Sequence, residues 1–378
     1  MTEPRIRLAR PSFDEEESRA VRRVLESGWV TQGSEVAAFE NAIAELHGVR
    51  HCIVVSSGTA ALHLSYLALG LGPGDLVFIP SFAWPSAANM ALAIGARPIL
   101  VDVLPGTFNL DPSDLRLRVA RCLREASGRP RAIVPVHQFG LAADMTAILE
   151  VAREHSLTVI EDAACALGAT YHGRPVGSLG AAAIFSFHPR KAVSTGEGGA
   201  VCTNDGALAE ECRALRNHGQ RELAGERDIY TAGFNYRMTE IQAAIGRVQL
   251  GKLPRILTRR AQIAALYNDA LTSTPGLELP QSVPYHTWQT YMTCVAQNIP
   301  RAAVIQELAQ QGVEVGPGCV AAHLMTLYRA ECATGSHLLP ISKSLHERGL
   351  ALPLHSLLTD SDVAEVCAHL TRTMTAMA

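Results

Sequence analysis

HCIVVSSGTAALHLSYLAL, residues 51–69, is the stretch that most directly predicts the fold of this chain. It begins with a short apolar, β-branched run, continues through the small polar turn Ser56–Thr59, and ends in residues typical of a buried helix. Hydroxyls and free N–H groups at such a helix start can bind a phosphate, although a turn that only caps the helix has the same composition. The stretch therefore predicts a strand–turn–helix unit with a candidate anion site.

Similar strand-like runs follow this unit, and helical stretches separate most of them. The runs cover residues 76–79, 98–101, 132–136, 158–160, 182–185 and 200–203. Short apolar strands that alternate with helices predict a parallel sheet with helices on both faces. Ligands of such sheets bind at the carboxyl ends of the strands, so residues that directly follow a strand are the candidates for function.

Helices are also predicted on either side of this sheet. Residues 14–26 and a segment that begins at Ser34 have apolar side chains at helical spacing before the sheet. After it, residues 239–253 predict a helix that Pro254 closes, and residues 256–271 predict a second, linking helix.

Beyond Ser273 the composition changes, with frequent Pro and Gly and short strand and helix signals. These signals predict a smaller α+β domain at the C-terminal end. We therefore expect a large domain over residues 1–250, which includes the N-terminal segment, and a small domain with its linking helix over residues 251–378.

Charge and hydropathy limit the partners of the chain. The 378 residues contain 33 Lys and Arg against 36 Asp and Glu, a net charge of −3, and no basic run of the kind that nucleic acids or anionic membranes attract. The charge-poor stretch 51–96 is broken by Ser, Gly and Pro into pieces shorter than a membrane span. The acidic N-terminal segment lacks the apolar run of an export signal. We expect a cytoplasmic protein without nucleic-acid or membrane partners.

The nine cysteines are scattered, odd in number and without a CxxC pair. This spacing fits neither a zinc site nor a disulfide framework. We therefore expect most of them to be small buried residues in a reducing compartment, and we expect no metal site.

Two further segments carry reactive side chains at strand ends. Glu161 and Asp162 follow an apolar strand, where a carboxylate would seek a cationic partner such as a ligand nitrogen, unless it only caps a helix. Lys191 follows another apolar strand and precedes a Gly-rich turn, where it could attack a carbonyl as an amine, unless it is an ordinary solvated lysine. A phosphate site, an acid and an amine together match the phosphate, the protonated ring nitrogen and the aldehyde of pyridoxal 5′-phosphate (PLP). Trp84 offers a flat surface for its ring.

Six motifs of the chain, taken in order, resemble those of the DegT/DnrJ/EryC1/StrS aminotransferases. They are SSGTAAL (56–62), IPSFAWPSAAN (79–89), VIEDAACALGA (159–169), FSFHPRKAVSTGEGG (185–199), RNHG (216–219) and GFNYRMTEIQAAIG (233–246). The resemblance covers nearly the whole chain. It implies the α/β fold of fold-type I PLP-dependent transferases, with a mostly parallel central sheet and a smaller C-terminal α+β domain, and a homodimer whose subunits share their active sites.

The resemblance also implies roles for single residues. Lys191 is expected to form the Schiff base with PLP and then to act as the base that moves a proton, and Asp162 is expected to pair with the pyridine nitrogen. Trp84 would cover the ring. The implied phosphate contacts are Gly58, Thr59, Ser186 and, from the neighbouring subunit, Asn235.

The chain departs from the family pattern inside one of these motifs. Cys165 stands where a glutamine usually contacts the phenolic oxygen of the cofactor, and Leu167 replaces the usual histidine. A thiol forms weak hydrogen bonds, so we expect this contact to be lost, taken over by water or supplied by another residue. Ala83 likewise stands where threonine is frequent. None of these three changes replaces Lys191 or Asp162, so we expect activity to be retained with altered tuning.

The function implied by the resemblance is a PLP-dependent amino transfer from L-glutamate to the 3- or 4-keto group of a nucleotide-linked deoxysugar. One alternative is amination of a cyclitol ketone with glutamine or alanine as donor, because the Trp84–Pro85 pair occurs in some such members. Dehydration of a ketosugar is a second alternative, but members with that activity carry histidine in place of Lys191. A regulatory protein that keeps the fold without turnover is the third.

Overall fold

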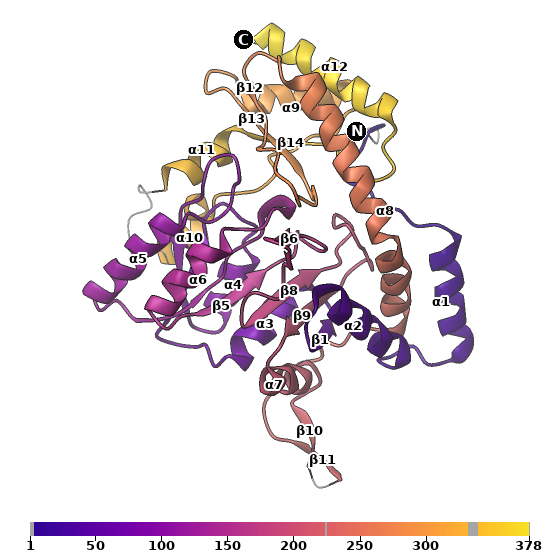
Figure 1. The fold of residues 1–378 in the computed structure, drawn as a ribbon, viewed down its shortest axis with the longest axis vertical. Helices are drawn as coiled ribbons and strands as arrows, with labels where there is room; N and C mark the ends of the chain where they lie inside the picture. Colours follow the sequence, from indigo (N-terminus) through magenta and orange to yellow (C-terminus); the bar gives the residue numbers. More distant parts are fainter. Residues whose placement is uncertain (1–3, 224, 332–338, 378) are drawn as a thin grey trace.

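A seven-stranded sheet forms the centre of the larger part of the molecule, in the strand order β1-β9-β8-β5-β4-β2-β3. The computed structural model describes residues 4–223, 225–331 and 339–377 (Figure 1). The strands are β1 (His51–Val55), β2 (Asp75–Pro80), β3 (Arg97–Val101), β4 (Arg129–Ile133), β5 (Thr158–Asp162), β8 (Ala182–Ser186) and β9 (Gly199–Thr203). Strands β3, β2, β4, β5 and β8 pair in parallel, so the predicted, mostly parallel sheet is confirmed.

Strand β9 is the exception to the parallel order. It pairs antiparallel with both β8 and β1. The connection from β8 to β9, residues 187–198, contains no helix. A parallel return needs a crossover, usually a helix, so this short connection brings the chain straight back alongside β8. The same connection carries Lys191.

Helices cover both faces of the sheet, because its strands carry apolar side chains on both faces. Val77 and Ile79 of β2 pack with α3 (Gly58–Ala68), α4 (Ser86–Ala93) and α7 (Gly206–Arg216). Leu76 and Phe78 of the same strand pack with α5 (Pro112–Arg124) and α6 (Met145–Glu154) on the other face. Since successive side chains of a strand point to opposite faces, one strand serves both layers.

Residues 240–271 form one continuous helix, α8 (Glu240–Leu271), although the sequence predicted two helices separated by Pro254. That prediction was wrong. The first half of α8 packs against α1 (Glu15–Ser27) and α2 (Ser34–His47), and its second half packs against α12 (Asp360–Met377). Proline inside a helix costs about 3 kcal/mol, and we attribute the continuity to burial of both halves, which outweighs this cost.

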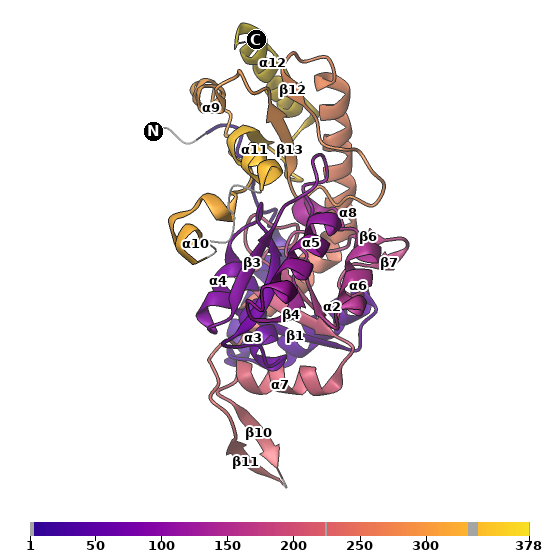
Figure 2. The same cartoon turned by 90° about the vertical axis from the view of Figure 1, so that its left-hand side faces the viewer.

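The C-terminal part contains the smaller α+β unit that the sequence predicted (Figure 2). Its three-stranded sheet has the order β12 (Leu277–Glu278), β13 (Tyr291–Val295), β14 (Gly349–Leu352). The helices around it are α9 (Arg301–Gln310), α10 (Thr326–Glu331), α11 (Pro340–Arg348) and α12. Ile6 pairs with Val313 and joins the hydrophobic cluster of this unit, so the N-terminal segment reaches it as well. The domain boundary near residue 250 stays a prediction, because α8 runs through it.

Short elements complete the structure. Strands β10 (Gln220–Leu223) and β11 (Glu226–Ile229) form a hairpin that projects away from the rest of the molecule (Figures 1 and 2). The others are the strand pair β6 (Thr170–Tyr171) and β7 (Arg174–Pro175) and the single turns η1 (Gln138–Gly140) and η2 (Ala322–Leu324). Among the residues that the structure describes, no helix combines the length and apolar character needed to cross a membrane.

Candidate active site

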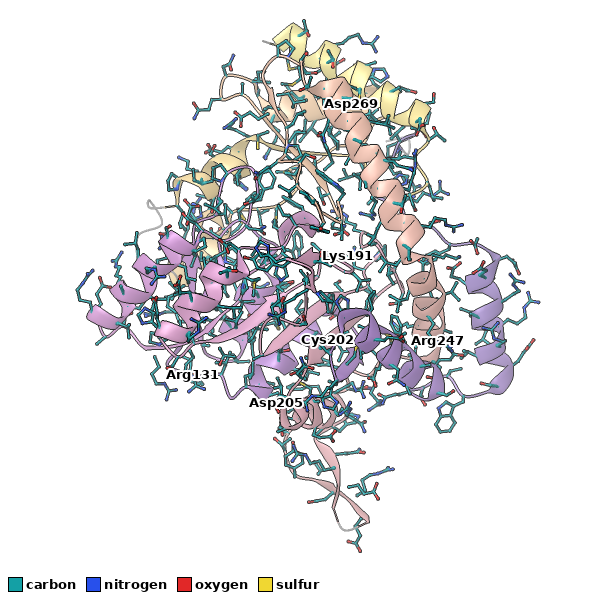
Figure 3. The ribbon with its side chains drawn as sticks, in the orientation of Figure 1. Arg131, Lys191, Cys202, Asp205, Arg247 and Asp269 are labelled. Atoms are coloured by element: carbon teal, nitrogen blue, oxygen red, sulfur yellow. The ribbon has the colours of Figure 1, made fainter. Side chains whose placement is uncertain are left out.

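The candidate residues gather at the carboxyl ends of the parallel strands. Asp162 is the last residue of β5, and Lys191 lies in the connection that follows β8. Figure 3 shows Lys191 near the middle of the molecule, where the sheet faces the C-terminal unit. The Gln289 side chain donates a hydrogen bond to the carbonyl oxygen of Arg190, so the C-terminal unit contacts the loop that carries the lysine. The site therefore lies where ligands of open α/β sheets bind.

The three lysines of the chain have different surroundings. Lys252 is buried, and its Nζ lies 2.7 Å from a carboxylate oxygen of Glu17 and 2.8 Å from one of Asp14. Lys343 is exposed on α11. Only Lys191 is partly buried at the strand ends without a carboxylate within ion-pair distance among the described residues. It is therefore the one lysine whose amine is available inside a site.

The start of α3 packs closely against β8 at position 58, which is a glycine. Ser57 caps the helix, because its Oγ accepts a hydrogen bond from the Ala60 N–H at 3.1 Å. A Cβ atom at Gly58 would lie 3.0 Å from the Cβ of Ser186, closer than almost all such contacts. The structure thus brings the predicted residues Gly58 and Ser186 together, with Thr59 next along the helix. Free N–H groups of a first helical turn and these hydroxyls suit a phosphate group.

Asp162 is a buried carboxyl group with few partners. Its side chain is 7% exposed, and its Oδ1 accepts a hydrogen bond from the Ala164 N–H at 3.1 Å. Burial raises the pKa of Asp162, and the Ala164 amide, Lys191 and His137 oppose this shift only in part. Within the described part of the chain it forms no ion pair, so it can receive a cationic ligand group.

The neighbouring carboxylate, Glu161, points to the opposite face and has a structural role that the sequence did not reveal. Its Oε2 lies 3.0 Å from Nε2 of His137. Nδ1 of His137 accepts a hydrogen bond from the Ala143 N–H, so Nε2 carries the hydrogen and donates it to Glu161. The other bonds to Glu161 come from the N–H groups of Gly177, Leu179 and Gly180.

This buried pair fixes the backbone beside Asp162. The His137 N–H donates to the Asp162 carbonyl, and the Asp162 N–H donates to the Pro135 carbonyl, both at 2.9 Å. Burial alone would raise the pKa of Glu161, but the His137 ring and the backbone amides hold it below its ordinary value. Only a histidine directly after a predicted strand, in the run VPVHQF at 134–139, could have signalled this pair in the sequence.

We predict that Glu161→Ala lowers the free energy of unfolding by about 3 kcal/mol, because the change leaves buried partners of the carboxylate unpaired. Urea unfolding measures this loss. Since the pKa of Glu161 is lowered, its contribution is fully present above the ordinary carboxyl pKa and disappears as the pH falls through the lowered value. Glu154→Ala, which breaks an exposed ion pair with Arg116, is the control and should cost less than about 1 kcal/mol. Equal losses in the two variants would contradict the assignment.

Cys165 lies beside the candidate lysine. Nζ of Lys191 donates a hydrogen bond to Sγ of Cys165 at 3.0 Å. Of the eight cysteines in the described residues, Cys165 alone is not buried. The residue that departs from the family pattern therefore contacts the residue expected to do the chemistry.

Trp84 lies in the loop after β2 with 70% of its surface exposed. The loop itself is well held, because the Ala322 N–H donates to the Ser81 carbonyl at 2.8 Å and Ser81 Oγ lies 2.7 Å from Nδ1 of His323. His323 and Tyr328 are both buried, and the Tyr328 hydroxyl donates a hydrogen bond to the Pro85 carbonyl at 3.3 Å. The indole is thus available to stack on a ligand, and that role stays a prediction.

Asn235 is exposed on a segment that passes close to the start of α3. Its backbone pairs with Asn217, and the carbonyl oxygen of the next residue, Tyr236, accepts a hydrogen bond from the Ser56 N–H at 2.9 Å. The described residues provide no hydrogen-bond partner for the Asn235 side chain. Its expected reach into a neighbouring subunit stays a prediction.

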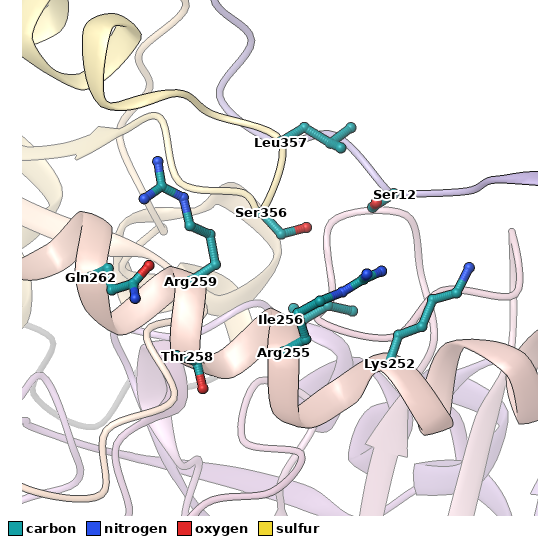
Figure 4. A pocket seen from close by; sticks show the side chains of 9 residues that line it. All are labelled: Ser12, Lys252, Arg255, Ile256, Thr258, Arg259, Gln262, Ser356 and Leu357. Carbon is teal, nitrogen blue, oxygen red and sulfur yellow. The ribbon is translucent and has the colours of Figure 1, made fainter.

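A separate cavity of about 480 Å³ lies along α8 (Figure 4). Three of its nine lining residues are basic, but Lys252 is bound by Glu17, and Arg259 donates to the Leu358 carbonyl. None of the predicted site residues lines it. Among the described residues there is also no cluster of three side chains able to hold a metal ion. The strand ends around Lys191 therefore remain the candidate site.

Comparison with known proteins relates this geometry to one family. The model of the DegT/DnrJ/EryC1/StrS aminotransferase family matches residues 11–371. The chain is 40% identical over 375 residues to the GDP-perosamine synthase of Caulobacter vibrioides, which covers 97% of this chain and 98% of that protein. PseC of Helicobacter pylori, an aminotransferase involved in the biosynthesis of pseudoaminic acid, has a TM-score of 0.91 at 27% identity, over 98% of this chain and 99% of that one. The PLP-form of Spr1654 from Streptococcus pneumoniae has a TM-score of 0.91 at 26% identity, over 99% of each chain.

Proposed function

Because this chain belongs to the DegT/DnrJ/EryC1/StrS aminotransferase family, whose members depend on PLP, we propose that it aminates a nucleotide-linked keto sugar. The amino donor we propose is L-glutamate, and the acceptor is the 3- or 4-keto group of a deoxysugar. The relative named GDP-perosamine synthase, which matches nearly the whole chain, supports a nucleotide-linked acceptor. The family, the fold type and the cofactor predicted from the sequence are confirmed.

The residues present at the strand ends fit PLP. The buried Asp162, which lacks an ion-pair partner among the described residues, suits the protonated ring nitrogen. The glycine-built start of α3 with Thr59 and Ser186 suits the phosphate, and the amine of Lys191 suits the aldehyde. When bound, PLP supplies an electron-withdrawing ring that stabilises the carbanion left after a proton is removed from the amino donor. The observation that carries the proposal is the placement of Lys191 and Asp162 on neighbouring strand ends.

In this proposal each residue of the site has a defined role. The Asp162 carboxylate holds a proton on the ring nitrogen, and its burial strengthens that interaction. Lys191 Nζ takes the proton from the α-carbon of the donor and later delivers a proton to the carbon that receives the amino group. The Glu161–His137 pair keeps the backbone of Asp162 in place. The exposed indole of Trp84 would stack on the ring.

We further propose that the active unit is a homodimer in which Asn235 reaches the phosphate bound by the partner. The β10–β11 hairpin supports this, since it projects away from its own subunit, and Ile229 at its base, paired with Gln220, is 65% exposed.

The dimer proposal predicts that Asn235→Ala weakens PLP binding about tenfold, the size expected for one lost hydrogen bond to a charged group. Fluorescence titration of cofactor-free protein with PLP measures the change. Sedimentation at the same concentrations should give a dimer for both proteins. A fully active monomer would contradict the shared site.

A substrate screen tests the proposed function. Purified PLP-loaded protein should convert to the aminated cofactor form with L-glutamate, and keto-sugar nucleotides should return it to the original spectrum. Free cyclitol ketones, and glutamine or alanine as donors, should have little effect. Turnover confined to cyclitol ketones would favour the alternative within the family, and no turnover with any acceptor would favour a regulatory protein.

A further inference from the structure

The contact between Cys165 and Lys191 is fixed by the loops that carry them. Cys165 follows β5 in a turn where the Ala166 N–H donates to the Ala163 carbonyl at 2.9 Å. The Lys191 N–H donates to the His188 carbonyl at 2.8 Å in the connection after β8. Since β5 and β8 are neighbours in the sheet, the two loops start side by side. The 3.0 Å approach of Nζ to Sγ therefore follows from the fold.

We propose that Cys165 positions Lys191 and exchanges a proton with it. In the exchange one N–H bond of the ammonium breaks and one S–H bond forms, so an ammonium–thiolate pair becomes an amine–thiol pair with the same net charge. No proton from solvent is needed. The glutamine that is usual at this position could not take part, because a side-chain amide neither accepts nor releases a proton under these conditions. The inference rests on the proposed role of Lys191 as the reacting amine.

The titratable and charged groups around the pair come from several elements. Asp162 at the end of β5 and His188 in the lysine loop act on Lys191, Arg260 of α8 acts on Cys165, and Cys319 lies near both. Burial raises the pKa of Cys319 to about 12 and lowers that of His188, so both are uncharged near neutral pH. Burial lowers the pKa of Arg260 only to about 10, so it remains a cation.

Two of these groups stabilise the charge-separated form of the pair. A carboxylate at Asp162 attracts the ammonium, and the Arg260 guanidinium attracts the thiolate. Nη1 of Arg260 is itself fixed by bonds to the carbonyl oxygens of Trp288 and Gln289, at 3.0 and 3.1 Å. The Lys191 ammonium is thus held next to a sulfur atom that can take its proton. Because Cys165 is accessible and has Lys191 against its sulfur, it should also be the most reactive thiol among the described residues.

Thiol alkylation of the full-length protein, freed of cofactor, tests the inference without measuring catalysis. The probe is iodoacetamide at pH 7, and peptide mass spectrometry gives the rate at each cysteine. We expect Cys165 to react first and Lys191→Met to slow its alkylation about tenfold, because the thiolate loses its cation. Lys191→Arg keeps the cation and should restore fast alkylation. Arg190→Met, which removes an exposed neighbouring cation, is the matched control and should leave the rate unchanged.

A second readout uses the PLP-loaded enzyme. The pH profile of its visible absorbance should shift in both Cys165→Gln and Cys165→Ala, whereas the melting temperature should change little. Alkylation of Cys165 that is no faster than that of the buried Cys202, or equal rates in Lys191→Met and wild type, would overturn the inference. The proposed function would fail differently, by absence of a borohydride-trapped cofactor on Lys191, so the two failures can be told apart.

Discussion

Replacing Lys191 by alanine should abolish the covalent attachment of PLP and lower turnover by about 10³-fold or more, the size typical of a lost proton-transfer group. The expectation follows from the surroundings of the three lysines. The buried Lys252 forms ion pairs with Glu17 and Asp14, and Lys343 is exposed on α11. Neither lysine can therefore replace the amine of Lys191 at the strand ends.

Borohydride reduction followed by peptide mapping measures the attachment. Wild-type protein should carry the reduced cofactor on the peptide that contains Lys191, and Lys191→Ala should carry none. Lys343→Ala is the matched control, since it removes an exposed lysine far along the chain and should leave both attachment and turnover unchanged. A reducible adduct that persists in Lys191→Ala would place the covalent chemistry on another residue.

Asp162→Asn should fold normally yet lose about 10²-fold to 10⁴-fold in turnover. The amide has nearly the shape of the carboxyl group, and its oxygen can still accept the Ala164 N–H bond. It carries no negative charge, however, so it cannot keep a proton on the ring nitrogen. Asp205→Asn, at the start of α7, is the control, because asparagine caps a helix as well as aspartate does. Turnover like that of the wild type in Asp162→Asn would show that the acid lies elsewhere.

The same variant has a second expected effect on stability. Because burial raises the pKa of Asp162, the folded state binds its proton more tightly than the unfolded state does. Stability of the cofactor-free protein therefore falls as the pH rises above the ordinary carboxyl pKa, when the buried group must ionise. Asp162→Asn removes this cost, so its melting temperature should exceed that of the wild type at pH 7 and match it at strongly acidic pH. A lower melting temperature at pH 7 would show that the carboxylate stabilises the empty site.

Local features of the sequence predicted most of the fold. The stretch 51–69 forms β1, the turn and α3 as expected, because its periodicity and capping residues act over neighbouring positions. The prediction that Pro254 ends a helix was wrong for the opposite reason. The effect of this proline depends on packing of α8 against α1, α2 and α12, which are distant in sequence and could not be weighed from local signals.

Local features of the sequence also predicted which candidate site residues lie close together. Gly58 and Ser186 meet, and Asp162 at the end of β5 lies beside β8, which the Lys191 loop follows, because parallel strands end at one edge of the sheet. The Glu161–His137 pair could not be foreseen, since its partners come from β5, the turn after β4 and the amides of residues 177–180. The contact of Cys165 with Lys191 likewise depends on the pairing of β5 with β8. The stacking role of Trp84 and the reach of Asn235 stay predictions.

Transfer of labelled nitrogen tests the central claim most directly. PLP-loaded protein is incubated with ¹⁵N-L-glutamate and a panel of 3- and 4-keto deoxysugar nucleotides, and mass spectrometry follows the sugar products. The account predicts one ¹⁵N atom in an amino sugar nucleotide with wild-type protein and none with Lys191→Ala. Absence of label from every sugar nucleotide, with label found instead in an aminated cyclitol or in no product, would contradict it.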